Sequence, residues 1–132
     1  MSDIDARMND AMQRHRAGDV DGAIQTYREL VDLEPDNGDL WHLLGVAVHQ
    51  KGNAGLAAEL IETAISLNHE AADYYANLAM VRRSLDDDDA AEAVLLRAIE
   101  VDAGHGRSHS NLAGVLRSRG DFEGALAAAE TA

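Results

Sequence analysis

Histidine and aspartate are the residues of this 132-residue chain with the most versatile chemistry. His105 and His109 are four positions apart, a spacing that places two imidazoles on one helix face and suits a bound metal ion. Asp102 is the nearest further ligand, and no other donor stands at a suitable spacing. We therefore expect solvated histidines rather than a metal site, and we predict no cofactor.

The run Asp86-Asp87-Asp88-Asp89 offers four carboxylates, which calcium prefers as ligands. It lacks the alternating spacing and the distal glutamate of a calcium-binding loop. Acidic side chains that precede a helix favour its positive N-terminal end, so the run is predicted to cap a helix. Because the chain has neither a glycine-rich phosphate loop nor a specific Ser-His-Asp set, the sequence predicts no enzyme.

Charge and composition bear on further classes of function. The formal net charge is −13, which disfavours nucleic acids and anionic membranes and favours basic or neutral partners. The same charge equally serves solubility alone. The absence of cysteine excludes disulfides and thiolate metal sites. No apolar run reaches membrane-spanning length, and the N-terminus lacks the features of a signal peptide, so a cytoplasmic protein is expected.

The elements that position these residues follow from an internal repeat of 34 residues. Leucine, small residues, and a glycine or aspartate followed by aspartate or asparagine recur in register. The matched columns are Leu44, Leu78 and Leu112; Ala23, Ala57, Ala91 and Ala125; Ala11, Gly45, Ala79 and Ala113; Gly18, Gly52, Asp86 and Gly120; and Asp19, Asn53, Asp87 and Asp121. The predicted repeats are 4–37, 38–71, 72–105 and a truncated 106–132.

Each column has a physical role in a helical hairpin. The glycine, or Asp86 in the third repeat, ends one helix in the left-handed conformation. The next residue caps the following helix, and the small residues let the two helices cross closely. Apolar residues at every third or fourth position complete the helical pattern. The predicted helices are 4–17, 20–33, 38–51, 54–67, 72–85, 88–101, 106–119 and 122–131.

This pattern resembles the tetratricopeptide repeat (TPR), whose motif places Trp, Leu-Gly, Tyr, Ala and Pro at fixed positions. The second repeat matches it best, through Trp41, Leu44, Gly45, Ala57 and Ala64. The resemblance implies an all-α fold, a right-handed α-solenoid of stacked antiparallel hairpins that forms a single domain over 1–132. Because the fourth repeat stops at Ala132 without a capping helix, we expect the N-terminal part of a longer protein.

The resemblance also implies that the first helix of each hairpin lines a concave groove. The sixth position of the repeats reads Asn9, Leu43, Asn77 and Asn111. A carboxamide both donates and accepts, as a peptide unit does, so this column is predicted to hold an extended polypeptide by its backbone. The column resembles the asparagine ladder in the TPR superhelix of O-linked N-acetylglucosamine transferase. The alternative is an asparagine that only contacts the adjacent repeat.

The other groove positions are mixed. The second position is acidic in three repeats, with Asp5, Asp39 and Asp73, and is Arg107 in the fourth. Three acids argue against the clamp by which chaperone-binding TPR domains hold a C-terminal carboxylate, and they predict basic residues in the ligand. An adaptable apolar floor and a basic or titratable rim complete the predicted site, namely Met12, Val46, Met80 and Gly114, and His15, His49, Arg83 and Arg117.

The sequence therefore predicts a protein-protein interaction scaffold that binds an extended peptide or partner segment in this groove. Two alternatives stay open. One is a self-assembly module, in which helix 122–131 forms a homodimer. The other is a substrate-presenting module of a larger enzyme such as a glycosyltransferase.

Overall fold

The computed structural model describes residues 2–131, except for the side chains of 122, 123, 130 and 131. Over that range the secondary structure is eight α-helices without strands, which confirms the predicted all-α class. Each helix begins and ends within one residue of its predicted bounds. The helices are α1 (Asp3–Arg16), α2 (Val20–Leu33), α3 (Gly38–Gln50), α4 (Ala54–Leu67), α5 (Ala72–Ser84), α6 (Asp88–Val101), α7 (Gly106–Ser118) and α8 (Phe122–Thr131).

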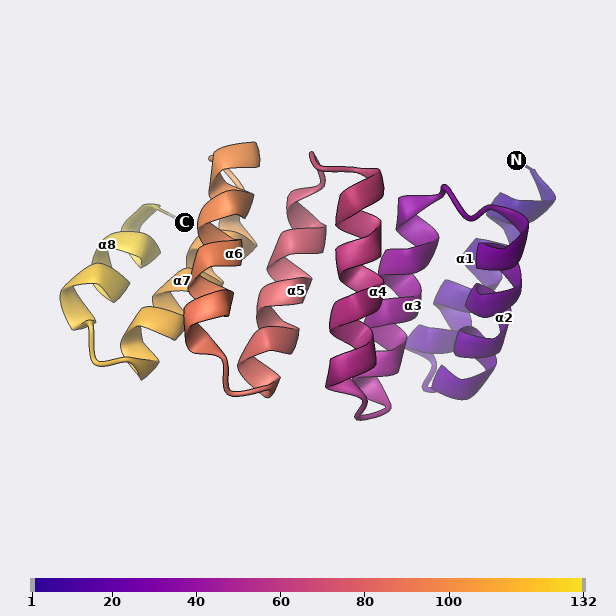
Figure 1. Cartoon of the computed structure of the whole chain (residues 1–132), viewed down its shortest axis with the longest axis horizontal. Coiled ribbons are helices and arrows are strands. Elements are labelled where there is room, and N and C mark those ends of the chain that lie inside the picture. Colours follow the sequence, from indigo (N-terminus) through magenta and orange to yellow (C-terminus); the bar gives the residue numbers. More distant parts are fainter. Residues whose placement is uncertain (1, 132) are drawn as a thin grey trace. The chain divides into compact units, whose positions relative to one another are not determined.

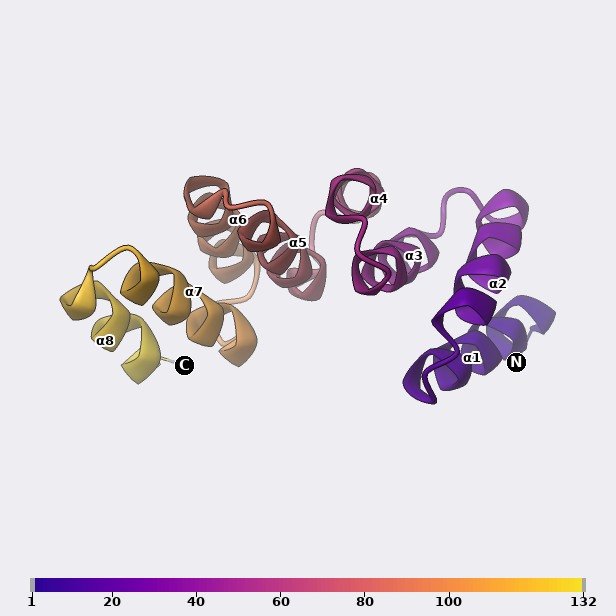
Figure 2. The ribbon, with the colours of Figure 1, turned by 90° about the horizontal axis from the view of Figure 1, so that it is seen from below.

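Consecutive helices pair as antiparallel hairpins, α1 with α2, α3 with α4, α5 with α6, and α7 with α8 (Figures 1 and 2). The hairpins group into two compact units, Met1–Asn68 and His69–Ala132. In the first unit α2 packs against α3, and in the second α6 packs against α7. Helix α5 also lies against α7, whereas α1 and α3 approach each other less closely.

The turn inside each hairpin has the predicted left-handed residue. Gly18, Gly52 and Gly120 have φ values of 96°, 93° and 82°, and Asp86 takes the same place with φ 58°. Asp86 is the one residue other than glycine with positive φ among the described residues. This conformation is less favourable for a residue with a Cβ atom than for glycine.

The residue after each left-handed position caps the next helix, as predicted. Asp19 Oδ1 accepts from the backbone N–H of Gly22, Asn53 Oδ1 from Leu56 and Asp87 Oδ1 from Ala90. Such a bond satisfies one of the free donors at a helix N-terminus. The acidic run thus owes its place to helix capping, because Asp87 is the cap of α6.

Small residues decide how closely the helices of a hairpin approach. A Cβ atom built on Gly45 would lie 2.6 Å from Ile61 Cγ1 and 3.2 Å from the Ala57 carbonyl oxygen. The α3 backbone therefore lies directly against α4. In the second unit the buried side chains of Ala79, Ala91, Leu95, Leu112 and Val115 form one apolar cluster between the hairpins.

Candidate functional site

The face that α1 and α3 share in the first unit is hollowed. One hollow of about 410 Å³ is lined by Met12, His15, Arg16, Tyr27, Leu43 and Gln50. A second, of about 220 Å³, is lined by Met8, Met12, Asp39, His42 and Leu43. Met12 and Leu43 line both, so the two hollows adjoin, and we call them together the α1/α3 hollow. It brings together four predicted contact residues, Met12, His15, Asp39 and Leu43.

The end of the α1/α3 hollow near the C-termini of the two helices is polar. His15 Nε2 and Gln50 Oε1 are 2.7 Å apart and link α1 to α3. Tyr27 of α2 is fully buried below this end. Its hydroxyl oxygen is buried and has no hydrogen-bond partner in the part of the chain that the structure describes. Burial raises the pKa of Tyr27 to about 12, against a smaller lowering by the charge of Arg16.

Three other predicted contacts in the first unit lie outside the α1/α3 hollow. Asn9 is exposed, and Val46 and His49 are half-buried. None of the three lines the hollow. Their predicted role in peptide contact stays a prediction.

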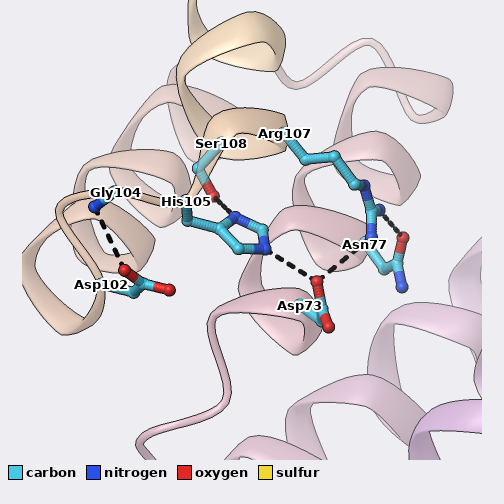
Figure 3. Close-up of polar contacts among 7 residues, drawn as sticks. All are labelled: Asp73, Asn77, Asp102, Gly104, His105, Arg107 and Ser108. Carbon is cyan, nitrogen blue, oxygen red and sulfur yellow. Dashed lines mark hydrogen bonds and ion pairs between the residues drawn. The ribbon is translucent and has the colours of Figure 1, made fainter. Parts of the chain in front are cut away.

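In the second unit, polar contacts on the corresponding face link α5 to the start of α7 (Figure 3). Asp73 Oδ1 accepts from His105 Nε2 at 2.7 Å and from Arg107 Nη1 at 3.3 Å. Arg107 Nη2 also donates to Asn77 Oδ1 at 2.5 Å. Asp73 and Asn77, both predicted ligand contacts, thus have partners within the chain. The cation that the sequence assigned to a ligand at Asp73 is here supplied by Arg107.

A Ser-His-Asp arrangement, which the sequence did not indicate, is part of this network. His105 Nδ1 lies 2.6 Å from Ser108 Oγ, while its Nε2 faces Asp73 (Figure 3). A nucleophile must be reachable by substrate, but Ser108 is 0% exposed. His105 is the N-cap residue of α7, and its contacts with Asp73 and Ser108 hold the start of that helix against α5. The arrangement is therefore structural.

The solvated state predicted for the histidine pair is wrong. His109 is 5% exposed, and its Nε2–H donates to the Ala103 carbonyl at 2.8 Å. One and two repeats earlier, Tyr75 and Trp41 make the equivalent bond, to the carbonyls of His69 and Pro35. His109 thus takes the place of the aromatic residue of the motif. Its ring nitrogen ties the helix to the preceding loop and is not available to a metal.

The remaining predicted contacts of the second unit differ in accessibility. Met80 is 49% exposed, and Arg117 is exposed as well. Arg83 Nη2 donates to Ser118 Oγ at 3.1 Å, across α5 and α7. Asn111 is half-buried, and its side-chain nitrogen is buried without a hydrogen-bond partner among the described residues.

A further hollow of the first unit is lined by α2 on one side and by Val48, Lys51, Asn53 and Leu56 of the α3–α4 hairpin on the other. It has a volume of about 520 Å³ and an apolar floor of Ile24, Val48 and Leu56. Acidic and basic side chains surround it, and Lys51 there pairs with Asp21 at 3.1 Å. Sequence reasoning missed this surface, because most of its lining comes from α2, a second helix, which the TPR resemblance does not place in the groove.

The described residues contain neither a membrane-spanning helix nor a cluster of metal ligands. No helix there is long and apolar enough to cross a membrane. No group of three or more His, Cys, Asp or Glu side chains in that range is arranged to hold a metal ion. The cytoplasmic location stays a prediction.

Solved structures that match the chain share this fold. The crystal structure of MamA superposes with a TM-score of 0.87 at 20% identity, over 98% of this chain and 75% of MamA. The O-GlcNAc transferase of Thermobaculum terrenum, solved as a mutant, has a TM-score of 0.81 and 32% identity. That match covers 86% of this chain but only 22% of the transferase. The first TPR of Spaghetti (RPAP3), bound to an HSP90 peptide, has a TM-score of 0.83 at 18% identity, over 89% of this chain and 93% of that one.

Sequence comparison leads to the same assignment. A family model described as TPR repeat matches residues 13–52, and one described as tetratricopeptide repeat matches residues 72–105. Together the two matches span more than half of the chain. No curated protein matches it. The repeat columns, the hairpins and both family models agree, and the chain belongs to the tetratricopeptide-repeat family.

Proposed function

We propose that the chain is a protein-interaction scaffold that binds an extended polypeptide segment, and that the α1/α3 hollow is its principal contact surface. The observation that carries the proposal is the shared floor of Met12 and Leu43, two half-buried apolar side chains at the junction of the two hollows. An apolar floor with a few polar groups around it is the usual composition of a binding pocket. The TPR of RPAP3, bound to an HSP90 peptide, supports peptide binding by this fold.

The flexible methionines suit this role. Met8 and Met12 are unbranched and adapt their shape to different ligand side chains. Asp39, with its carboxylate at one end of the hollow, favours a basic residue in the ligand. The net charge of −13 acts in the same direction at longer range.

The proposal is tested by selecting peptides that bind the wild-type chain and measuring their binding to variants. Peptides selected from a random phage-displayed library on the wild-type chain are retested on Leu43→Gln and on Leu33→Gln. Leu33 is the matched control, because it lies outside the α1/α3 hollow and is 61% exposed. We expect Leu43→Gln to weaken binding about tenfold, since a buried leucine contact contributes roughly 1.5 kcal/mol, and Leu33→Gln to have no effect. Peptides that respond to Leu56→Gln instead would place the site between α2 and the α3–α4 hairpin.

For the second unit by itself, we propose a ligand-binding surface along α5 and α7, with contacts from Asn77, Asn111 and Met80 and with Arg83 and Arg117 on its rim. Met80 supports this, because it is 49% exposed although apolar. The double substitution Asn77→Ala with Asn111→Ala is expected to weaken binding of the selected peptides. Unchanged affinity for every peptide would rule out the asparagine ladder.

Two other functions have support from specific observations. The 32% identity to an O-GlcNAc transferase over 86% of this chain favours a substrate-presenting module of a larger enzyme. Leu126 of α8 is 62% exposed, which favours self-association through that helix. Sedimentation velocity of wild type and Leu126→Gln separates the second function from peptide binding: a dimer that dissociates in the variant supports self-association.

A further inference from the structure

The α1/α3 hollow carries opposite charges at its two ends. Asp39 stands in the first turn of α3, beside Met8. Arg16 is the last residue of α1 and lies at the other end, with Gln50, the last residue of α3. Gln50 stands eleven positions after Asp39 in α3, or about 16 Å along the helix. An extended peptide covers that length with about five residues. A ligand along the hollow therefore meets a carboxylate at one end and a guanidinium at the other.

The hydroxyl of Tyr27 at the Arg16 end is not needed by the fold. Tyr27 is fully buried, and its oxygen has no partner within the described residues. Ile61 and Leu95 occupy the same position one and two repeats later, and both are also fully buried. An aliphatic side chain thus fills this place in the core elsewhere in the chain. A buried hydroxyl without a partner costs about 1–3 kcal/mol, a cost that a ligand acceptor would remove.

We propose that Arg16 and Tyr27 form a subsite for a carboxylate of the bound polypeptide, with Asp39 facing a basic residue at the other end of the hollow. Arg16 is exposed and, unlike Arg14 in the same turn, has no ion pair among the described residues, so its charge is available to a ligand. The Tyr27 hydroxyl is covered in this structure. The carboxylate therefore reaches it only when side chains at this end of the hollow shift, such as that of the exposed Arg16. This inference rests on the proposed function.

The subsite differs from the carboxylate clamp rejected on sequence grounds. That clamp needs basic side chains at the second position of the repeats, where this chain has Asp39 and Asp73. Here the guanidinium comes from the last turn of α1 and the hydroxyl from α2. A side-chain carboxylate and a C-terminal carboxylate offer the same chemistry to these two groups.

Synthetic peptides with blocked termini test the subsite. The parent is acetyl-Lys-Ser-Met-Ser-Ser-Glu-amide, made also in the reverse order because the direction of the ligand is open. Its variants replace Glu by Gln, Lys by Gln, or Met by Ser. A further peptide has Gln in place of Glu and a free C-terminal carboxylate. Dissociation constants are measured by amide NMR titration for wild type, Tyr27→Phe, Arg16→Gln and the control Arg14→Gln. Arg14 lies in the same last turn but pairs with Asp10.

We expect the Glu-to-Gln change to weaken binding to wild type about fivefold to tenfold, which corresponds to about 1–1.4 kcal/mol. The same change should have less than a twofold effect in Tyr27→Phe and in Arg16→Gln, and its full effect in Arg14→Gln. Rescue of the Gln peptide by a free C-terminus would identify a terminal carboxylate as an equally good ligand. Equal effects of the Glu-to-Gln change in all four proteins would overturn the subsite.

The failure of the subsite is distinguishable from failure of the proposed function. If the Met-to-Ser peptide binds as well as the parent, the apolar hollow is not the binding surface, whatever the effect of the Glu-to-Gln change. If binding depends on Met but not on Glu, only the subsite is wrong. No binding of either parent orientation at millimolar concentration overturns both. Thermal unfolding of Tyr27→Phe is recorded in parallel. If that variant is not folded at the temperature of the titration, the result for Arg16→Gln, a substitution at an exposed position, decides whether the subsite exists.

Discussion

Arg107 of α7 donates from Nη2 to the Oδ1 atom of Asn77 on α5, one repeat earlier, at 2.5 Å (Figure 3). The bond engages the carboxamide oxygen of a residue that the sequence predicted either to bind a ligand or to contact the adjacent repeat. The structure therefore shows the contact of Asn77 with the neighbouring repeat, and its contact with a peptide stays a prediction. Asn111, in the same column, has no such bond, and its amide nitrogen is buried without a partner among the described residues.

This difference predicts that Asn111→Leu stabilises the chain. Leucine has the branched shape of asparagine, although it is larger, and Leu43 already occupies the column in the second repeat. Removing a buried unsatisfied amide is expected to raise the free energy of unfolding by about 1 kcal/mol. Urea unfolding monitored by circular dichroism measures the change. Asn77→Leu is the control and should be destabilising, because it breaks the bond from Arg107; equal effects of the two substitutions would contradict the assignment.

Gly45→Ala is expected to be destabilising although alanine is the better helix former. The added Cβ would lie 2.6 Å from Ile61 Cγ1, and the backbone oxygen of Ala57 restricts relief by a shift of α3. Overpacking of this kind costs about 1–3 kcal/mol. Gly55→Ala in α4 is the control, because its new Cβ meets nothing closer than 4.0 Å, and it should stabilise by roughly 0.5–1 kcal/mol. Thermal unfolding compares the two, and a stable Gly45→Ala would show that α3 and α4 can separate.

Asp86→Gly is expected to raise stability by about 1 kcal/mol, because the left-handed conformation is costly for a residue with a Cβ atom. Asp86 has φ 58°, and the three equivalent turns have glycine. Chemical denaturation measures the gain. The neighbouring Asp88→Gly places glycine in the first turn of α6 and should instead be destabilising. If Asp86→Gly were also destabilising, the Asp86 side chain would have a role other than ending the turn.

The buried phenol of Tyr27 predicts a loss of stability at alkaline pH. Its pKa is raised to about 12 in the folded chain, against about 10 in the unfolded chain. Between these values the unfolded state loses a proton that the folded state keeps, so the free energy of unfolding falls as the pH rises. The stabilisation is complete below about pH 10, and the loss by pH 12 is on the order of 2 kcal/mol.

Tyr27→Phe isolates this contribution from other groups that titrate in the same range. Urea unfolding of wild type and variant at about pH 9 and about pH 11.5 measures the difference. Between about pH 9 and about pH 11.5, the free energy of unfolding should fall more for wild type than for Tyr27→Phe. If the difference in free energy of unfolding between the two proteins is the same at both pH values, the phenol is less buried than in this structure.

The sequence by itself determined the repeat, the helix bounds and the caps, because these depend on local interactions. A left-handed turn needs glycine or a tolerant residue such as Asp86, and a cap such as Asp87 reaches only to its own helix. The period also placed Gly45 where two helices cross. These features could be predicted because their physical causes act within a few residues, or within one hairpin.

Only the tertiary structure decided how the first helices of neighbouring repeats meet. Asp73, Asn77 and Arg107 join α5 to α7 through contacts that span 30 to 34 residues. The equivalent positions on α1 and α3 include Leu43, which cannot make such bonds, and there the surface is hollowed. Whether a groove residue binds its neighbour or stays open to a ligand depends on side-chain lengths and on the distance between helices. The matched positions of a sequence repeat do not predict the distance between neighbouring helices.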